Sequence, residues 1–261
     1  FALLGLAVIG LSSTYSDAAM TGRQIMDKQK KLHKVSSEYE LQKMVLVDKS
    51  GVKENRELKR YTKEFGKDNY RSLLVFMSPA EIKGTALLTW QHPDRADDQW
   101  LYLPANKKLQ RIAGGSKKNY FMGTDFTYED LEPEKLDDNT YKLVREEKFQ
   151  DQDCYVVEAV PASKEKARKS GYKRRVLWIT KTNFVTVKTE FYDRRNKLIK
   201  FQENRDWQNV QKSVWRAQKG LMDNQKTKHK TLVGSVNRET NNKIEDQVFT
   251  ERYILKGLHT K

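Results

Sequence analysis

The chain has 261 residues, a formal net charge of +15 and one cysteine. A single cysteine excludes an intramolecular disulfide, and Cys154 lies in an apolar run that predicts a buried side chain instead of a nucleophile. The positive charge favours anionic partners, among them lipid head groups and acidic proteins. Because lysines and arginines occur in nearly every segment, solubility alone is an alternative explanation for the charge.

The start of the chain predicts export. Residues 1–11 are only Phe, Ala, Leu, Val, Ile and Gly, and Ser16-Asp17-Ala18 matches a small-x-small cleavage site. A bilayer span needs roughly 20 apolar residues, so this run is too short for a transmembrane anchor. We therefore expect a cleaved signal peptide over 1–18, a periplasmic location, and a single domain over 19–261. Export makes nucleic acid a poor partner, even for so basic a chain.

The next segments predict one helix followed by strands. Thr21 and Gln24 have the spacing of a capping box, and residues 21–34 are rich in straight-chain helix formers. Over 39–47 the apolar residues alternate with polar ones, as in a half-buried strand, and 48–51 is a turn signal. This pattern predicts the start of an antiparallel meander.

Further strands follow at short spacing, and no long helical pattern alternates with them, which argues against a parallel α/β sheet. Two short helical segments are expected, at 124–131, before Pro133, and at 246–255. The predicted strands cover 39–47, 52–65, 70–77, 100–103, 109–112, 141–147, 154–160, 174–179, 185–192, 197–204, 213–222 and 228–237.

These strands do not suit a closed barrel. A closed and fully packed barrel needs inward-facing apolar residues in every strand, whereas 53–63 is polar on both faces. We therefore predict a mainly β fold of the α+β type, in which an unclosed antiparallel β-barrel carries short helices as a lid over a hydrophobic cavity.

No motif for catalysis or metal binding stands out. There is no Gly-x-Ser-x-Gly sequence, Cys154 lacks an obvious histidine partner, and the four histidines are dispersed along the chain. The adjacent carboxylates Glu129-Asp130 are of a kind common in turns and helix starts, and 114–116 suits a flexible turn. The sequence therefore predicts a binding protein without metal or cofactor, not an enzyme. The alternative of a lipid hydrolase is disfavoured, because the sequence has no nucleophile motif.

Large apolar side chains concentrate between residues 90 and 128. Adaptable aromatic and methionine surface suits a pocket for acyl chains, although ordinary core packing is the simpler explanation for any one of these residues. We expect the following residues to line the cavity or its lid: Trp90, Trp100, Tyr102, Phe121, Met122, Phe126 and Tyr128.

The same region resembles a known family. Residues 98–104, 111–112 and 120–131 resemble the signature of the outer-membrane lipoprotein-sorting proteins, which are LolA-like or LolB-like periplasmic proteins often encoded beside RND-type exporters. Tyr120 and Thr124 stand where Ser is expected. The resemblance implies an unclosed antiparallel barrel with a helical lid over a hydrophobic cavity, and it implies no catalytic residues.

Two functional hypotheses follow from this resemblance. In the first, the protein is a monomeric periplasmic carrier that binds acyl chains of lipoproteins or lipids for transfer toward the outer membrane. In the second, it is an accessory or sensor subunit of an inner-membrane RND-type exporter and uses the same fold without acting as a shuttle. Co-purifying acylated cargo would favour the first hypothesis, and a tightly bound protein partner would favour the second.

Overall fold

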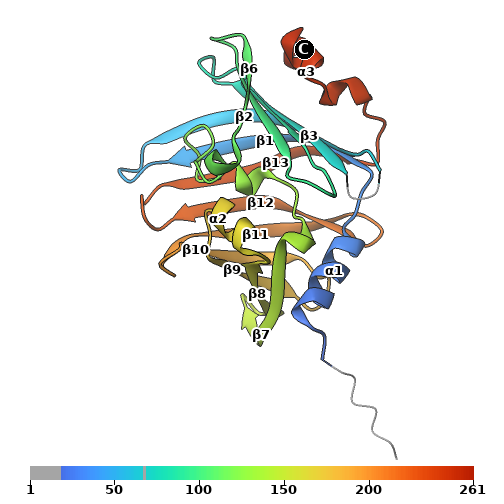
Figure 1. Ribbon diagram of the computed structural model, residues 1–261, viewed down its shortest axis with the longest axis vertical. Coiled ribbons are helices and arrows are strands. Elements are labelled where there is room, and N and C mark those ends of the chain that lie inside the picture. The colour runs from blue at the N-terminus through green and yellow to red at the C-terminus, as the bar shows by residue number, and fades with distance from the viewer. Residues whose placement is uncertain (1–18, 67–68) are drawn as a thin grey trace, which may run out of the picture.

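A computed structural model describes residues 19–66 and 69–261 of the chain, so the expected signal peptide over 1–18 lies outside the described residues. The described residues form a thirteen-stranded antiparallel sheet with the strand order β6-β5-β4-β3-β2-β1-β13-β12-β11-β10-β9-β8-β7. The strands β6 and β7 form the two edges, and they do not pair with each other. The sheet is therefore strongly curved but unclosed, as predicted (Figure 1).

The elements follow the predicted order closely. The strands are β1 (Ser37–Val47), β2 (Lys53–Glu64), β3 (Tyr70–Ser78), β4 (Ala86–Trp90), β5 (Asp98–Leu103), β6 (Lys108–Arg111), β7 (Asn139–Phe149), β8 (Gln152–Pro161), β9 (Arg174–Thr180), β10 (Thr186–Tyr192), β11 (Leu198–Gln211), β12 (Val214–Asn224) and β13 (Lys230–Thr240). The helices are α1 (Gly22–Leu32), α2 (Lys164–Lys169) and α3 (Glu251–Leu255), with the 3-10 turns η1 (Gly114–Ser116), η2 (Glu129–Leu131), η3 (Leu136–Asp138), η4 (Asp246–Phe249) and η5 (Leu258–Thr260).

The helical segments differ from the prediction in two places. The segment 124–131 is helical only over η2, because Thr124 and Phe126 belong to a tight turn closed by Phe121 N–H donating to Phe126 O at 2.8 Å. The helix α2 was not predicted at all. Its six residues are mostly charged and none is buried, so it has no apolar periodicity that a sequence pattern would show.

The sheet has two distinct faces, which we call inner and outer. On β8, Val157 and Ala159 point to the inner face, where α1 packs, while Cys154 and Val156 point to the outer face beside Trp178. The buried position predicted for Cys154 is confirmed. This alternation is what a sheet covered on both sides requires of its strands.

Helix α1 covers one half of the inner face. The predicted capping box is present, because Gln24 N–H donates to Thr21 Oγ1 at 3.2 Å and Thr21 N–H donates to Gln24 Oε1 at 2.8 Å. Its buried residues Ile25 and Met26 pack against Phe184 and other inner-face residues of β8 and β9. The cap and this apolar stripe together set where the helix begins and which side it buries.

The other inner half is covered by residues 112–138, which we call the crossover. Since β6 and β7 are opposite edges of the sheet but consecutive in the chain, the crossover must pass across the inner face to join them. Gln99 Nε2 donates to Tyr128 O at 3.1 Å and Arg56 Nη1 donates to Met122 O at 2.6 Å, so strands β5 and β2 both hold it down. The crossover is thus the natural cover of the concave side.

The C-terminal segment covers part of the outer face (Figure 1). Phe249 and Ile254 are fully buried against Leu73, Val75 and other outer-face residues of β3 to β6. Trp90 Nε1 donates to Phe249 O at 2.8 Å, which fixes this segment on the sheet. No helix among the described residues reaches the length and apolarity required to cross a membrane.

Candidate functional site

The crossover divides the concave side of the sheet into two cavities. The first, which we call the α2 pocket, has a volume of about 760 Å³ and lies among the crossover, α2 and strands β8 to β11. The second, which we call the α1 pocket, has a volume of about 820 Å³ and lies among α1, strands β1 and β2 and the end of the crossover. Glu134, Lys135 and Asp138 line both, so the end of the crossover is the wall between them. Both volumes suit a small-molecule or acyl-chain ligand.

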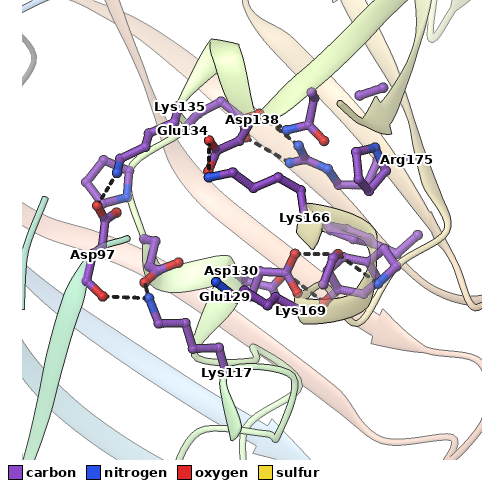
Figure 2. A pocket seen from close by; sticks show the side chains of 18 of the residues that line it. Asp97, Lys117, Glu129, Asp130, Glu134, Lys135, Asp138, Lys166, Lys169 and Arg175 are labelled. Atoms are coloured by element: carbon purple, nitrogen blue, oxygen red, sulfur yellow. Dashed lines mark hydrogen bonds and ion pairs between the residues drawn. The ribbon is translucent and has the colours of Figure 1, made fainter. Parts of the chain in front are cut away.

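The α2 pocket has an apolar floor and a charged rim. Its floor comes from the inner faces of α1 and the sheet, through Met26, Ala159, Leu177 and Phe191. The rim carries both signs of charge, and Figure 2 shows these side chains converging from the segment before β5, the crossover, α2 and β9. The labelled rim residues are Asp97, Lys117, Glu129, Asp130, Glu134, Lys135, Asp138, Lys166, Lys169 and Arg175. A cavity with this polarity fits an amphiphile better than a wholly apolar ligand.

Ion pairs fasten the crossover to the sheet on both sides of the α2 pocket (Figure 2). Arg175 on β9 donates from two nitrogens to Glu134, at 2.8 and 2.9 Å, and Tyr141 on β7 donates to Glu134 Oε1 at 2.7 Å. On the opposite side, Lys135 Nζ lies 2.5 Å from Asp97 Oδ1, at the start of β5. The crossover is therefore anchored to strands at both ends of the sheet order.

A buried lysine holds the middle of the crossover. The side chain of Lys200, on β11, is fully buried, and its ammonium donates to Asp130 Oδ2 at 2.5 Å and to Asp125 O at 2.8 Å. The ammonium also lies within about 5.4 Å of the ring centres of Tyr172 and Phe191. Tyr172 in turn donates its hydroxyl to Asp130 Oδ1 at 2.8 Å. A buried charge is tolerated only with such partners, so this group is a fixed part of the structure.

Two carboxyl groups of the crossover have raised pKa values. Burial raises the pKa of Glu132 to about 7, although its ion pair with Lys117 opposes the change. Burial also raises the pKa of Glu129, against the hydrogen bonds that it accepts from Gly171 N–H at 2.8 Å and Ser170 Oγ at 2.6 Å. Both groups line the α2 pocket, so the charge of its wall changes near neutral pH through Glu132.

The α1 pocket is bounded by paired charges and two tryptophans. Arg216 Nε donates to Glu38 Oε2 at 3.0 Å, and Arg238 pairs with both Glu38 and Glu40. Burial lowers the pKa of His33, whose Nε2 lies 2.9 Å from Asn183 O. Trp207 and Trp215 complete the wall beside α1. Arg216 and Arg238 are thus already matched by carboxylates of the same wall.

The seven residues expected to line a cavity or lid lie on both faces of the sheet. On the outer face, Trp90, Trp100 and Tyr102 pack beneath the C-terminal segment. On the inner face, Phe121, Met122 and Tyr128 of the crossover pack on β1 to β4, with Phe121 stacked on Phe76 at 5.7 Å, and Phe126 packs behind Tyr172 and Phe191 of the α2 pocket. None of the seven lines either of the two pockets.

Sequence reasoning missed the charged residues of the crossover and their partners. The acid-rich run 129–138 was visible, but adjacent carboxylates were attributed to turns, and Asp130 is 70 residues from its partner Lys200. Lys200 lies in the middle of a strand, but so do Lys43 and Lys188, which are not buried, so the sequence contains no specific signal of this ion pair. Among the described residues, no group of three or more His, Cys, Asp or Glu side chains is placed to hold a metal ion.

Comparisons with known proteins agree with this architecture. A family model described as an uncharacterized protein matches residues 68–256, and no curated protein matches the chain significantly. An outer membrane lipoprotein-sorting protein domain from Vibrio parahaemolyticus is 30% identical, with a TM-score of 0.85, and the match covers 90% of this chain and 98% of that one.

Two further solved structures extend the likeness. A DUF1329 family protein from Desulfovibrio piger is 27% identical with a TM-score of 0.84, over 89% of this chain and 97% of that one. A LolA superfamily protein from Nitrosomonas europaea shares the fold at 20% identity with a TM-score of 0.71, over 90% of this chain and 100% of that one. The Nitrosomonas structure shows that the chain shares the LolA fold, and the identity and coverage of the Vibrio domain show that it belongs to the family of outer membrane lipoprotein-sorting proteins.

Proposed function

We propose that this protein is a non-enzymatic carrier that binds the acyl chain of a lipid or lipoprotein in the α2 pocket, in the periplasm. The observation that carries the proposal is the apolar floor of Met26, Leu177 and Phe191, which lies beneath a crossover that covers only part of the concave side of the sheet. An acyl chain leaving water for this floor gains about 0.8 kcal/mol for each buried methylene. The rim would hold the polar end of the same ligand.

Phe121, Met122, Phe126 and Tyr128 belong, in this proposal, to the cover that the crossover forms over the inner face. Trp90, Trp100 and Tyr102 support the sheet from its outer face. Transfer toward the outer membrane requires an acceptor that binds the cargo more tightly than this protein does. The raised pKa of Glu132, in the wall of the pocket, makes release sensitive to pH near neutrality.

A pocket-filling substitution tests the proposal. Gln202 on β11 lines the α2 pocket, so Gln202→Trp should occupy the space above the apolar floor and weaken binding of a fluorescent fatty acid by on the order of tenfold. The matched control is Arg205→Trp on the same strand, whose side chain is 56% exposed and lines neither pocket, and which should bind as the wild type does.

The outcomes separate the two functional hypotheses. Equal fatty-acid binding by the wild type and Gln202→Trp would remove the α2 pocket from the proposal. Native mass spectrometry of the purified chain should find acylated cargo. A bare chain mass together with a tightly bound membrane-protein partner would instead favour an accessory subunit of an exporter.

A further inference from the structure

One end of the half-barrel is far more basic than the other. In the antiparallel register, Val47 pairs with Lys53 and with Lys230, and Tyr192 pairs with Arg174 and Leu198. The turns β1–β2, β10–β11 and β12–β13 and the α2 connection therefore lie together at one end of the sheet, at the left of Figure 1. We call this surface the basic end. Its exposed cations are Lys49, Lys53, Lys118, Lys164, Arg168, Lys169, Lys173, Arg194, Arg195, Lys197, Lys226, Lys228 and Lys230.

Few acids neutralise this surface. Within its turns, Asp48 and Asp193 accept hydrogen bonds from backbone N–H groups of their own turns, at 2.8 to 3.0 Å, and Glu165 pairs with Lys169. Lys230 pairs with Asp223, on the end of β12. In the part of the chain that the structure describes, the other cations of the basic end form no ion pair with a carboxylate.

Contacts between the turns make the basic end one continuous surface. Arg194 donates to Arg168 O at 2.7 Å, which joins the β10–β11 turn to α2. Asn224 donates to the hydroxyl of Tyr120 at 2.9 Å, which joins the β12–β13 turn to the crossover. These contacts fix the β10–β11 turn against α2 and the β12–β13 turn against the crossover, so the surface is held by the fold.

The turns at the opposite end have no such excess of positive charge, although α1 and the residues after it add the exposed Lys28, Lys31 and Lys34 there. Its described turns, at 91–97, 150–151, 181–185, 212–213 and 241–246, contain acids at least as often as bases. The acids are Asp94, Asp97, Asp151, Glu245 and Asp246, and the bases are Arg95, Lys181, Lys212 and Lys243. The basic end therefore carries the larger excess of positive charge, which orients the molecule in an electric field.

Two exposed apolar side chains lie among these cations. Val52, beside Lys53, is 67% exposed, and Tyr120, two residues after Lys118, is 41% exposed. Tyrosine with its hydroxyl bonded and its ring exposed is a common residue of membrane–water interfaces, and clustered lysines are attracted to acidic lipid head groups. A convex array of lysine-rich turns fits a fluid, flat and anionic surface, because such a surface demands no fixed register between individual charges.

We propose that the basic end is a docking surface for an anionic lipid bilayer. Lys169 belongs both to this end and to the wall of the α2 pocket, and its neighbour Lys166 also lines that wall, so docking brings the mouth of the pocket to the membrane. The surface is separate from the acyl-binding floor. Loss of docking therefore leaves acyl binding intact, and loss of acyl binding leaves docking intact.

The test uses flotation of the full chain with phosphatidylcholine vesicles, with and without phosphatidylglycerol. We expect binding only to the anionic vesicles at an ionic strength of about 0.1 M, and its loss at about 1 M, where the Debye length falls to about 3 Å. Inorganic phosphate matched to the lipid phosphate should not compete. Competition by that phosphate would instead identify a local phosphate site and overturn the proposal.

Charge-reversed variants separate the basic end from net charge alone. Lys173→Glu/Arg195→Glu/Lys226→Glu changes three exposed residues of the basic end and should lower binding to anionic vesicles by on the order of tenfold or more. The control Lys148→Glu/Lys212→Glu/Lys243→Glu makes the same charge change at the opposite end and should bind nearly as the wild type does.

Three results decide against a docking surface. These are no binding of the wild type to anionic vesicles, equal binding to both vesicle types, or equal losses in the two triple variants. The first of them would leave an acidic protein as the partner of the basic end. Fluorescent fatty-acid binding by the same variants, measured without vesicles, should be unchanged.

Discussion

Lys200 illustrates how a single residue organises the inner face. Its ammonium is fully enclosed, and its ion pair with Asp130 links β11 to the crossover across 70 residues of sequence. A buried pair of this kind contributes little more than a well-packed apolar pair would, but removal of one partner leaves the other charge buried and uncompensated. The energetic consequence of a mutation here therefore depends on which partner remains.

Replacement of Lys200 by methionine should lower the free energy of unfolding by about 3–5 kcal/mol, because Asp130 would remain buried without its cation. Urea denaturation measures this change. The control Lys230→Met removes a half-exposed partner of Asp223 and should cost less than about 1 kcal/mol. If the Asp130→Asn change, added to Lys200→Met, recovers none of the loss, the uncompensated carboxylate is not its cause.

Glu132 gives the stability of the protein a defined pH dependence. Its pKa is raised from 4.5 in the unfolded chain to about 7 in the folded protein, because burial disfavours the carboxylate. Between these values the folded state binds more protons than the unfolded state, so this group lowers stability as pH rises from 4.5 through about 7.

The difference in free energy of unfolding between the wild type and Glu132→Gln should therefore fall as pH rises through this window, and should become constant above it. Denaturation of both proteins at several pH values measures this difference. The contributions of His33 and His259 cancel in it, because both proteins contain these residues. A difference independent of pH would place the pKa of Glu132 at its ordinary value.

At the level of elements, the C-terminal segment and the crossover have matching roles. Each is an irregular stretch with short helical turns, and each covers one face of the same half of the sheet. The sequence predicted helix over 246–255, and the structure contains η4 and α3 there, separated at Thr250, whose hydroxyl accepts from Tyr253 N–H. The cover of the outer face was therefore partly predictable, whereas the path of the crossover was not.

Phe249 is the main anchor of the C-terminal segment. It is fully buried, lies edge-on to Phe65 at 5.6 Å, and its carbonyl accepts the indole N–H of Trp90. Phe249→Ala should cost about 3–5 kcal/mol of unfolding free energy and shift tryptophan emission to the red, as Trp90 becomes solvated. Leu255→Ala, at a side chain that is 54% exposed, should change stability by no more than about 0.5 kcal/mol. Equal effects of the two changes would mean that this segment does not protect the outer face.

At the scale of the whole molecule, curvature and charge asymmetry act together. An unclosed sheet leaves a trough, the crossover divides it, and the basic end lies beside the mouth of one of the resulting pockets. The net charge predicted an anionic partner, but composition alone could not separate a charged end from an evenly solvated surface. The concentration of cations at one end becomes visible only in the structure, where antiparallel pairing brings turns that are distant in sequence to the same end.

The sequence by itself determined the strand rhythm, the capping box at Thr21, the burial of Cys154, and the family motif over 98–131, because these depend on local periodicity or on short runs of residues. Only the tertiary structure decided which face each aromatic side chain takes, how the crossover reaches from β6 to β7, and which carboxylate meets Lys200. Those features depend on strand register and on contacts between distant residues, which a local pattern does not encode.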